Sequence, residues 1–264
     1  MITTREQAAE ACTQLSLIAA KMIAHLNNLQ PQQSEVAHFF KGVVVRTGVH
    51  LKDSAVILQT NHDQHISSAF VIFRVLLDDV LRACYVYASP DRQRAVDDLT
   101  AKAYKDWFKT WKEAARLNQK LQLGDALTDA LVDAERDKFM KSQDSDPYVS
   151  VDAQNARQLR NGVRADEMIR AMEQCPRVAT YARAYVLFKL MSHYVHFSML
   201  PYQMDRAKHS RALEIQFVDE VMFLAYHLLK VATEVLAETN AQLTWPTSPA
   251  DTRFDRPTYL VKQP

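Results

Sequence analysis

The sequence predicts an all-α fold: a single-domain bundle of about seven or eight helices, followed by an extended, proline-rich C-terminal tail. Only 4 of its 264 residues are glycine, which leaves little material for hairpin turns or phosphate-binding loops. Apolar residues also recur at helical spacing through most of the chain, between residues that cap or break helices. We therefore assign the bundle to residues 1–243 and the tail to residues 244–264.

The first three helices are expected at about residues 4–28, 34–59 and 63–88. Thr4 is a suitable cap for the first helix, because its hydroxyl can accept a hydrogen bond from a free backbone N–H of the first turn. The third is apolar on most of its sides, so we expect it at the centre of the bundle.

The remaining helices follow the same capping and breaking signals. Ser89 and Pro90 suit the start of a long amphipathic helix. Residues 142–150 (SQDSDPYVS) are polar and poorly periodic, as is typical of a loop. We expect these helices at about residues 90–123, 126–141, 152–174, 176–199 and 212–239.

Composition narrows the class of protein. The formal net charge of +1 gives no global field that would attract nucleic acid or a membrane. Three isolated cysteines, Cys12, Cys84 and Cys175, favour a reducing compartment over disulfides or a thiolate metal site. The N-terminal residues lack the pattern of a signal peptide, and charged residues interrupt the longest apolar runs, which argues against a membrane span. We expect a cytoplasmic protein.

Two apolar stretches each carry a short group of polar residues. One, HISSAFVIFRVLLDDVLRACYVY, contains Arg74 and Asp78. The other, YARAYVLFKLMSHYVHFSML, contains Tyr185, Ser192 and His196. Helices this apolar are normally buried, where an unpaired charge costs several kcal/mol. We therefore expect the two groups to meet, either as a functional site or as a structural polar cluster.

Arg74 and Asp78 are four residues apart, so they share a helix face and are able to pair. A guanidinium also offers a planar fork of donors to a phosphate. The alternative is an ion pair that ties neighbouring helices together and binds nothing.

Tyr185, Ser192 and His196 lie within about 40° of one line along a helix, and Lys189 extends this line. His196 titrates near neutral pH and is the candidate general base or acid. Ser192, one turn earlier, is placed to orient the imidazole. The alternative is a buried histidine that only satisfies polar groups of the core.

Two His-x-x-His pairs, His62 with His65 and His193 with His196, raise the question of a metal. His65 faces about 180° away from the stripe that begins at Arg74. Neither pair belongs to a His-Glu-x-x-His or carboxylate-rich motif. We predict no metal and no other cofactor.

The long helix after Pro90 carries a basic stripe that includes Lys105, Lys109 and Lys112. Beside aromatic residues, such a stripe is able to hold an RNA or DNA backbone. Acidic residues, among them Glu113, stand at pairing distance along the same helix, so a solvated, salt-bridged surface is the alternative.

The two polar groups resemble the motifs of a large bacterial family of uncharacterised helical domains, in which they read LLRxLLE and YxxxSxxxHPS. Here they stand as IFRVLLDD at residues 72–79 and LMSHYVHFS at residues 190–198. Asp78 replaces the Glu of the family motif, and Phe197 stands in place of its Pro. The likeness extends over roughly residues 53–201.

Such families are similar to HEPN domains, many of which are ribonucleases, toxins or phage-defence proteins that act as dimers. In the HEPN ribonuclease signature an Arg precedes a His by a short spacing, which Lys189 and His196 reproduce here with Lys in place of Arg. The resemblance implies a metal-independent ribonuclease with the site residues His196, Arg74, Asp78, Ser192, Tyr185 and Lys189. The alternative is a non-catalytic helical module that binds a protein or a small ligand. Both functions are compatible with a homodimer.

Overall fold

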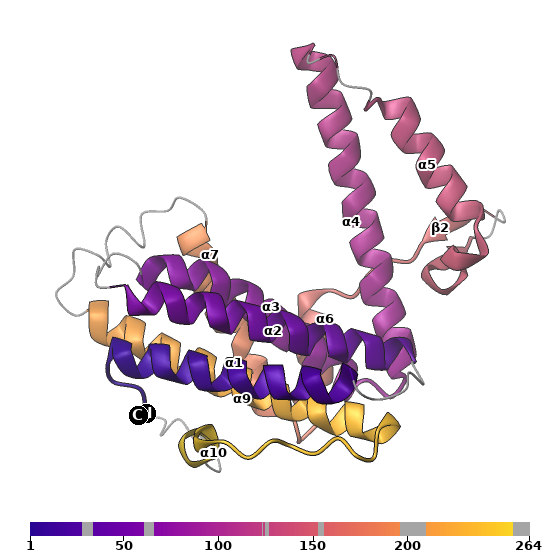
Figure 1. Cartoon of the computed structure of the whole chain (residues 1–264). Coiled ribbons are helices and arrows are strands. Elements are labelled where there is room, and N and C mark those ends of the chain that lie inside the picture. The colour runs from indigo at the N-terminus through magenta and orange to yellow at the C-terminus, as the bar shows by residue number, and fades with distance from the viewer. Residues whose placement is uncertain are drawn as a thin grey trace. The chain divides into compact units, whose positions relative to one another are not determined.

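A computed structural model confirms the all-α class (Figure 1). Within the described residues, the strands form a single two-stranded sheet. The chain divides into two compact units: unit 1 contains residues 1–88 and 169–264, and unit 2 contains residues 89–168. None of the described helices combines the length and apolar character needed to cross a bilayer. The described residues are 1–27, 34–60, 66–122, 124, 127–152, 156–195 and 210–255.

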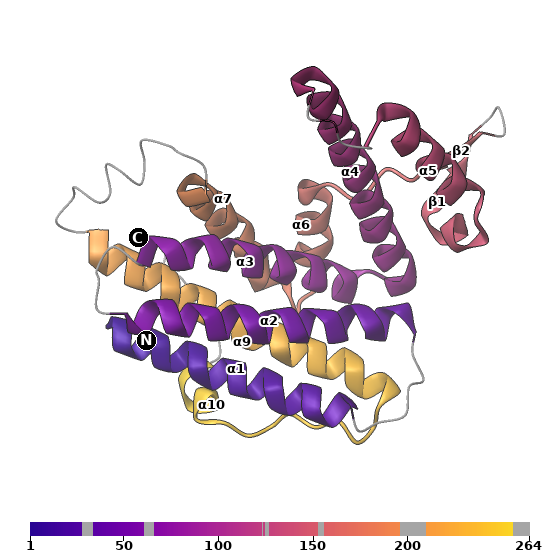
Figure 2. The same cartoon turned by 45° about the horizontal axis from the view of Figure 1, so that its top comes forward.

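Unit 1 is built from long helices that lie side by side (Figures 1 and 2). The three helices expected in the first third of the chain are confirmed, with ends within about three residues of the expected ones. The main helices of this unit are α1 (Arg5–Asn27), α2 (Glu35–Gln59), α3 (Ile66–Ala88), α7 (Ala184–Val195) and α9 (Ser210–Thr239).

The first two helices begin at side-chain caps and pack closely against each other. The Thr4 hydroxyl accepts a hydrogen bond from the backbone N–H of Gln7 at 3.2 Å, as expected for a cap. The apolar face of α1 is buried and packs on α2. A Cβ atom at Gly48 would lie 3.0 Å from the Cβ of Ala19. Gly48 therefore permits a close approach of the two helices.

The centre of unit 1 is formed by α3 and α9. α3 packs against α2, α7 and α9 (Figure 2), and this confirms the central position expected from its apolar sequence. Phe70 and Phe73 of α3 are fully buried, as is Leu228 of α9. Burial of these side chains stabilises the unit by roughly 1.5–3 kcal/mol each.

The segment expected to be an extended tail contains a short helix, α10 (Pro249–Phe254). The Ser248 hydroxyl accepts from the backbone N–H of Ala250, while the Asp251 carboxylate accepts from the backbone N–H of Ser248. This capping box, with proline at the first helical position, explains why a proline-rich segment is helical here. Phe254 is buried and anchors the helix.

Unit 2 contains two helices, a 3₁₀ helix and a β-hairpin. A small core holds Phe108, Val132 and Leu159. Helix α4 is capped by Asp91, whose carboxylate accepts from the backbone N–H of Arg94 at 2.9 Å, and not by Ser89. The elements are α4 (Arg92–Leu121), α5 (Asp129–Lys141), the 3₁₀ helix η2 (Gln143–Tyr148), β1 (Val149–Val151) and β2 (Arg157–Leu159).

The helix expected over residues 152–174 is wrong in its first half. Residues 157–159 form β2, which pairs antiparallel with β1, and helix α6 covers only Ala165–Glu173. Leu159 is buried in the core of unit 2, so tertiary packing overrides the local helical pattern. The helix expected over 176–199 begins later, as the 3₁₀ helix η3 (Ala179–Arg183), which continues into α7.

Candidate functional site

The two polar groups meet where α3 packs against α7. The Nε atom of Arg74 donates a hydrogen bond to the Ser192 hydroxyl at 3.0 Å. The guanidinium also lies over the Phe188 ring, with Cζ 4.7 Å from its centroid. Arg74 and Ser192 are both partly exposed. The expected encounter of the two segments is therefore present at these residues, in a position that solvent reaches. We call Arg74, Phe188 and Ser192 the α3–α7 cluster.

Ser192 fixes the orientation of Arg74. Its hydroxyl donates to the backbone carbonyl of Phe188 at 2.7 Å, which leaves the oxygen lone pairs facing the guanidinium. Among the described residues, the two terminal nitrogens of Arg74 have no hydrogen-bond or ion-pair partner. The cluster therefore holds the guanidinium by Nε, and its planar fork of donors makes no hydrogen bond to a described residue.

Asp78 does not pair with Arg74. Its carboxylate pairs with Arg82, one turn further along α3, at 2.8 Å. In a helix, an acid that precedes a base by four residues interacts better than an acid that follows one, because the helix dipole favours that order. The ion pair of Arg82 with Asp78 thus forms in the favourable order, and no carboxylate among the described residues pairs with Arg74.

Of the other residues in the second polar group, the structure describes Tyr185 and Lys189 but not His196. The Lys189 ammonium lies 5.3 Å from the centroid of the Tyr185 ring, a cation–π contact on the exposed surface of α7. His196 lies outside the described residues, as do His62 and His65. His193 is described and exposed. No group of three or more His, Cys, Asp or Glu side chains able to hold a metal ion occurs in the part of the chain that the structure describes.

A buried ion pair beside this cluster was not expected from the sequence. Asp79 is 5% exposed and pairs with Arg46 of α2 at 3.1 Å. Burial raises the pKa of Asp79 to about 6, although Arg46 opposes the shift. The consecutive acids of the LLDD sequence were a signal for it, but nothing local indicated that the second acid points to α2.

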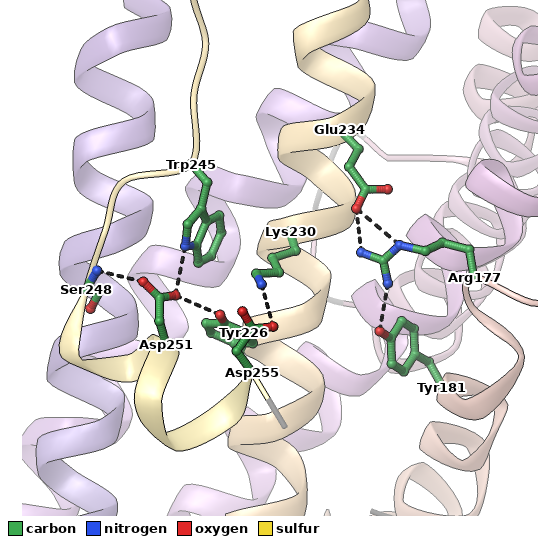
Figure 3. A network of polar contacts seen from close by, with 9 residues as sticks. All are labelled: Arg177, Tyr181, Tyr226, Lys230, Glu234, Trp245, Ser248, Asp251 and Asp255. Carbon is green, nitrogen blue, oxygen red and sulfur yellow. Dashed lines mark hydrogen bonds and ion pairs between the residues drawn. The ribbon is translucent and has the colours of Figure 1, made fainter. Parts of the chain in front are cut away.

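A second polar network joins α9 to η3 and α10 (Figure 3). Arg177 forms an ion pair with Glu234 and donates to the Tyr181 hydroxyl at 3.0 Å. Around α10, the Asp251 carboxylate accepts from Tyr226 and Trp245, at 2.7 and 2.8 Å. The contacts of Arg177 with Glu234 and of Tyr226 with Asp251 join residues 57 and 25 positions apart, so no spacing rule could have found them.

His227 lies between the two halves of this network, in an aromatic environment. Its ring stacks on Tyr181 at 5.1 Å and meets Phe223 edge to face at 4.3 Å. It is 8% exposed, and neither ring nitrogen makes a hydrogen bond of good geometry with a described residue. Burial lowers the pKa of His227 to about 4, with Arg177 and Lys230 adding to the shift and Asp255 and the Phe254 backbone opposing it.

The free energy of unfolding should therefore fall as the pH is lowered, because the unfolded chain binds a proton more readily than folded His227 does. Between about pH 6.5 and pH 4 the unfolded chain binds a proton that folded His227 does not, so the free energy of unfolding decreases by up to about 3 kcal/mol. His227→Phe should remove this component while matching wild type within about 1 kcal/mol near pH 7. Urea unfolding at both pH values measures it. The variant His38→Gln, on an exposed histidine, should follow wild type; parallel curves for wild type and His227→Phe would contradict the prediction.

The three lysines of the basic stripe on α4 each contact a neighbouring side chain, but only Lys112 has a carboxylate at close range. Lys109 lies 3.8 Å from Glu113, Lys112 pairs with Asp133 of α5 at 2.7 Å, and the Lys105 ammonium donates to the Asn161 amide at 3.0 Å. The pairing along the helix fits the salt-bridged surface that was the alternative expectation. The pairing of Lys112 with Asp133 was not predicted, and it links the stripe on α4 to α5.

Comparison of the chain with family models, curated proteins and solved structures found no match.

Proposed function

We propose that the chain is a cytoplasmic, dimeric, HEPN-like ribonuclease that works without a metal ion, and that the α3–α7 cluster binds the phosphate at the cleaved bond. The observation that supports the proposal is the orientation of the Arg74 guanidinium and the availability of its terminal N–H donors. Its guanidinium is oriented by Ser192 and Phe188, lacks a carboxylate among the described residues and has an unused fork of donors. This is the arrangement that a phosphate oxyanion requires.

The chemistry would follow the usual course of metal-independent RNA cleavage. A general base removes the proton of a ribose 2′-hydroxyl, whose oxygen attacks the adjacent phosphorus. The P–O bond to the 5′-oxygen of the next nucleotide breaks, and that oxygen receives a proton from a general acid. The products are a 2′,3′-cyclic phosphate and a 5′-hydroxyl end.

The residues divide these roles by their chemistry. His196, four positions after Ser192 in the sequence, would transfer the protons, because imidazole is the side chain suited to both accepting and donating a proton in this role. Arg74 would bind the phosphate oxygens through its fork, and Lys189 would add a second positive charge. Tyr185 would orient Lys189, as their cation–π contact suggests. Asp78 pairs with Arg82, so we assign it no role at the phosphate.

A non-catalytic binding module is the competing function, and a different observation favours it. A groove of about 500 Å³ lies along α1 and α2, and it is lined by exposed apolar side chains that include Leu17, Val49 and Val56. Exposed apolar patches of this kind mark sites of protein interaction. In that case the Arg74–Ser192 hydrogen bond would serve only to hold α3 against α7.

An RNA cleavage assay distinguishes the two functions. Wild type and His196→Ala should be incubated with single-stranded RNA in the presence of EDTA, and circular dichroism should show equal helix content. We expect wild type to produce 2′,3′-cyclic phosphate ends and His196→Ala to lose at least about a hundredfold in rate. Equal cleavage by both proteins, or cleavage by neither, would refute the ribonuclease and favour the binding module.

A further inference from the structure

Unit 2 contains a cavity that the ribonuclease proposal does not use. It has a volume of about 360 Å³ and lies between α4, α5 and β2. Its apolar floor is formed by Phe108, Val132 and Leu159, which are all buried in the core of the unit. The volume falls within the range of pockets that bind small molecules.

Cationic side chains surround this floor. Lys105, Lys109 and Lys112 come from α4, and Arg136 comes from α5, while Asp133 is the one carboxylate among the lining residues. Lys112 and Asp133 neutralise each other through two contacts of 2.7 and 2.8 Å. The hydrogen bond from Lys112 lowers the pKa of Asp133, so this carboxylate stays charged and continues to hold the lysine.

The other three cations are poorly neutralised. The partner of Lys105 is the uncharged amide of Asn161, at 3.0 Å. Lys109 is 3.8 Å from Glu113, and both side chains are mostly exposed, so this pair contributes little. Arg136 is exposed to solvent and makes no hydrogen bond or salt bridge with a described residue. It acts on Asp133 only at longer range, where it helps to lower the pKa of that carboxylate. The cavity thus concentrates uncompensated positive charge above an apolar floor.

The nearest basic residues on either side of the cavity along α4 are paired with acids. Lys102 pairs with Asp106 at 3.4 Å and Arg116 pairs with Asp129 at 3.3 Å. A protein that binds a nucleic-acid backbone presents a continuous basic track that follows the phosphates. An isolated cationic pocket suits instead a single molecule with one phosphate group or two.

We infer that this cavity binds a nucleoside phosphate, with the base on the Phe108 floor and the phosphate between Lys105, Lys109 and Arg136. An aromatic base gains by covering apolar and aromatic side chains, as in other ligand pockets. The guanidinium of Arg136 takes the phosphate oxygens in a bidentate manner, and the two ammonium groups add charge. This ligand site is independent of the α3–α7 cluster, since it shares no residue with it.

Isothermal titration calorimetry on the full chain tests the inference, with ADP, UDP and adenosine as probes. We expect both diphosphates to bind and adenosine to bind at least about tenfold more weakly, because it lacks the phosphate. Arg136→Gln should weaken ADP binding at least about tenfold. This variant should fold normally, since Arg136 is exposed and makes no hydrogen bond or salt bridge with a described residue.

Two further measurements make the test specific. Lys138→Gln removes the same charge from an exposed position of α5 outside the cavity, and it should leave ADP affinity unchanged. The inference is overturned if neither diphosphate binds, or if Arg136→Gln and Lys138→Gln have equal effects. It is also overturned if a single-stranded RNA oligonucleotide binds through Arg136 and ADP fails to displace it.

Discussion

Replacing Arg74 by alanine should lower the rate of RNA cleavage by about a hundredfold, which corresponds to about 2.7 kcal/mol of lost transition-state stabilisation. The guanidinium is held by Ser192 and Phe188 before any substrate arrives, so little reorganisation is needed when a phosphate binds. Removing such a preoriented donor is costly because the developing negative charge on the phosphate oxygens loses its partner. Initial rates with single-stranded RNA in EDTA measure the effect.

A neighbouring arginine provides the matched control for this prediction. Arg82 lies on the same helix and carries the same charge, but its guanidinium is paired with Asp78. Arg82→Ala should therefore keep the cleavage rate within about threefold of wild type, because a partly exposed helix ion pair contributes little. Equal rates for Arg74→Ala and Arg82→Ala would show that the α3–α7 cluster does not bind the phosphate.

Replacing Asp251 by alanine should destabilise unit 1 by about 3 kcal/mol. Its carboxylate accepts hydrogen bonds from the Tyr226 hydroxyl, the Trp245 indole and the backbone N–H of Ser248 (Figure 3). Tyr226 is fully buried, so the substitution removes the acceptor of a hydroxyl that lies in the core. It also removes half of the capping box of α10. Urea unfolding near pH 7 measures the loss.

The variant Asp255→Ala is the control for Asp251→Ala, because both substitutions remove one negative charge from the same segment. The Asp255 carboxylate pairs with Lys230 at 2.7 Å and is 56% exposed, so Asp255→Ala should cost at most about 1 kcal/mol. A loss of equal size in both variants would mean that charge in this segment, and not the hydrogen bonds of Asp251, determines the stability.

Elements whose ends depend on residues close in sequence were predicted correctly, and elements that depend on contacts between distant residues were not. The first three helices were located well because their caps and breaks are local: the hydroxyl of Ser34, for example, accepts from the backbone N–H of Ala37. The hairpin of β1 and β2 was missed because its strands are fixed by pairing of Val149 with Leu159 and by burial of Leu159. The sequence also gave no indication that residues 89–168 form a separate unit.

The same distinction applies to the polar residues. The meeting of Arg74 with Ser192 could be expected, because charged groups in apolar helices need partners and few were available. The choice of Arg82 by Asp78 could not be read from spacing alone, since arginines stand four residues away on both sides. The ion pair of Arg177 with Glu234 joins residues 57 positions apart, for which the chain carries no local signal.

The division of the chain also has a consequence during synthesis on the ribosome. Unit 1 is discontinuous, with residues 1–88 and 169–264 separated by the whole of unit 2. Arg74 therefore leaves the exit tunnel 118 residues before Ser192, and α3 is made long before α7 and α9 can cover its apolar surface. Unit 2 is continuous, so the whole of it is synthesised before α7 and α9 are available to complete the core of unit 1.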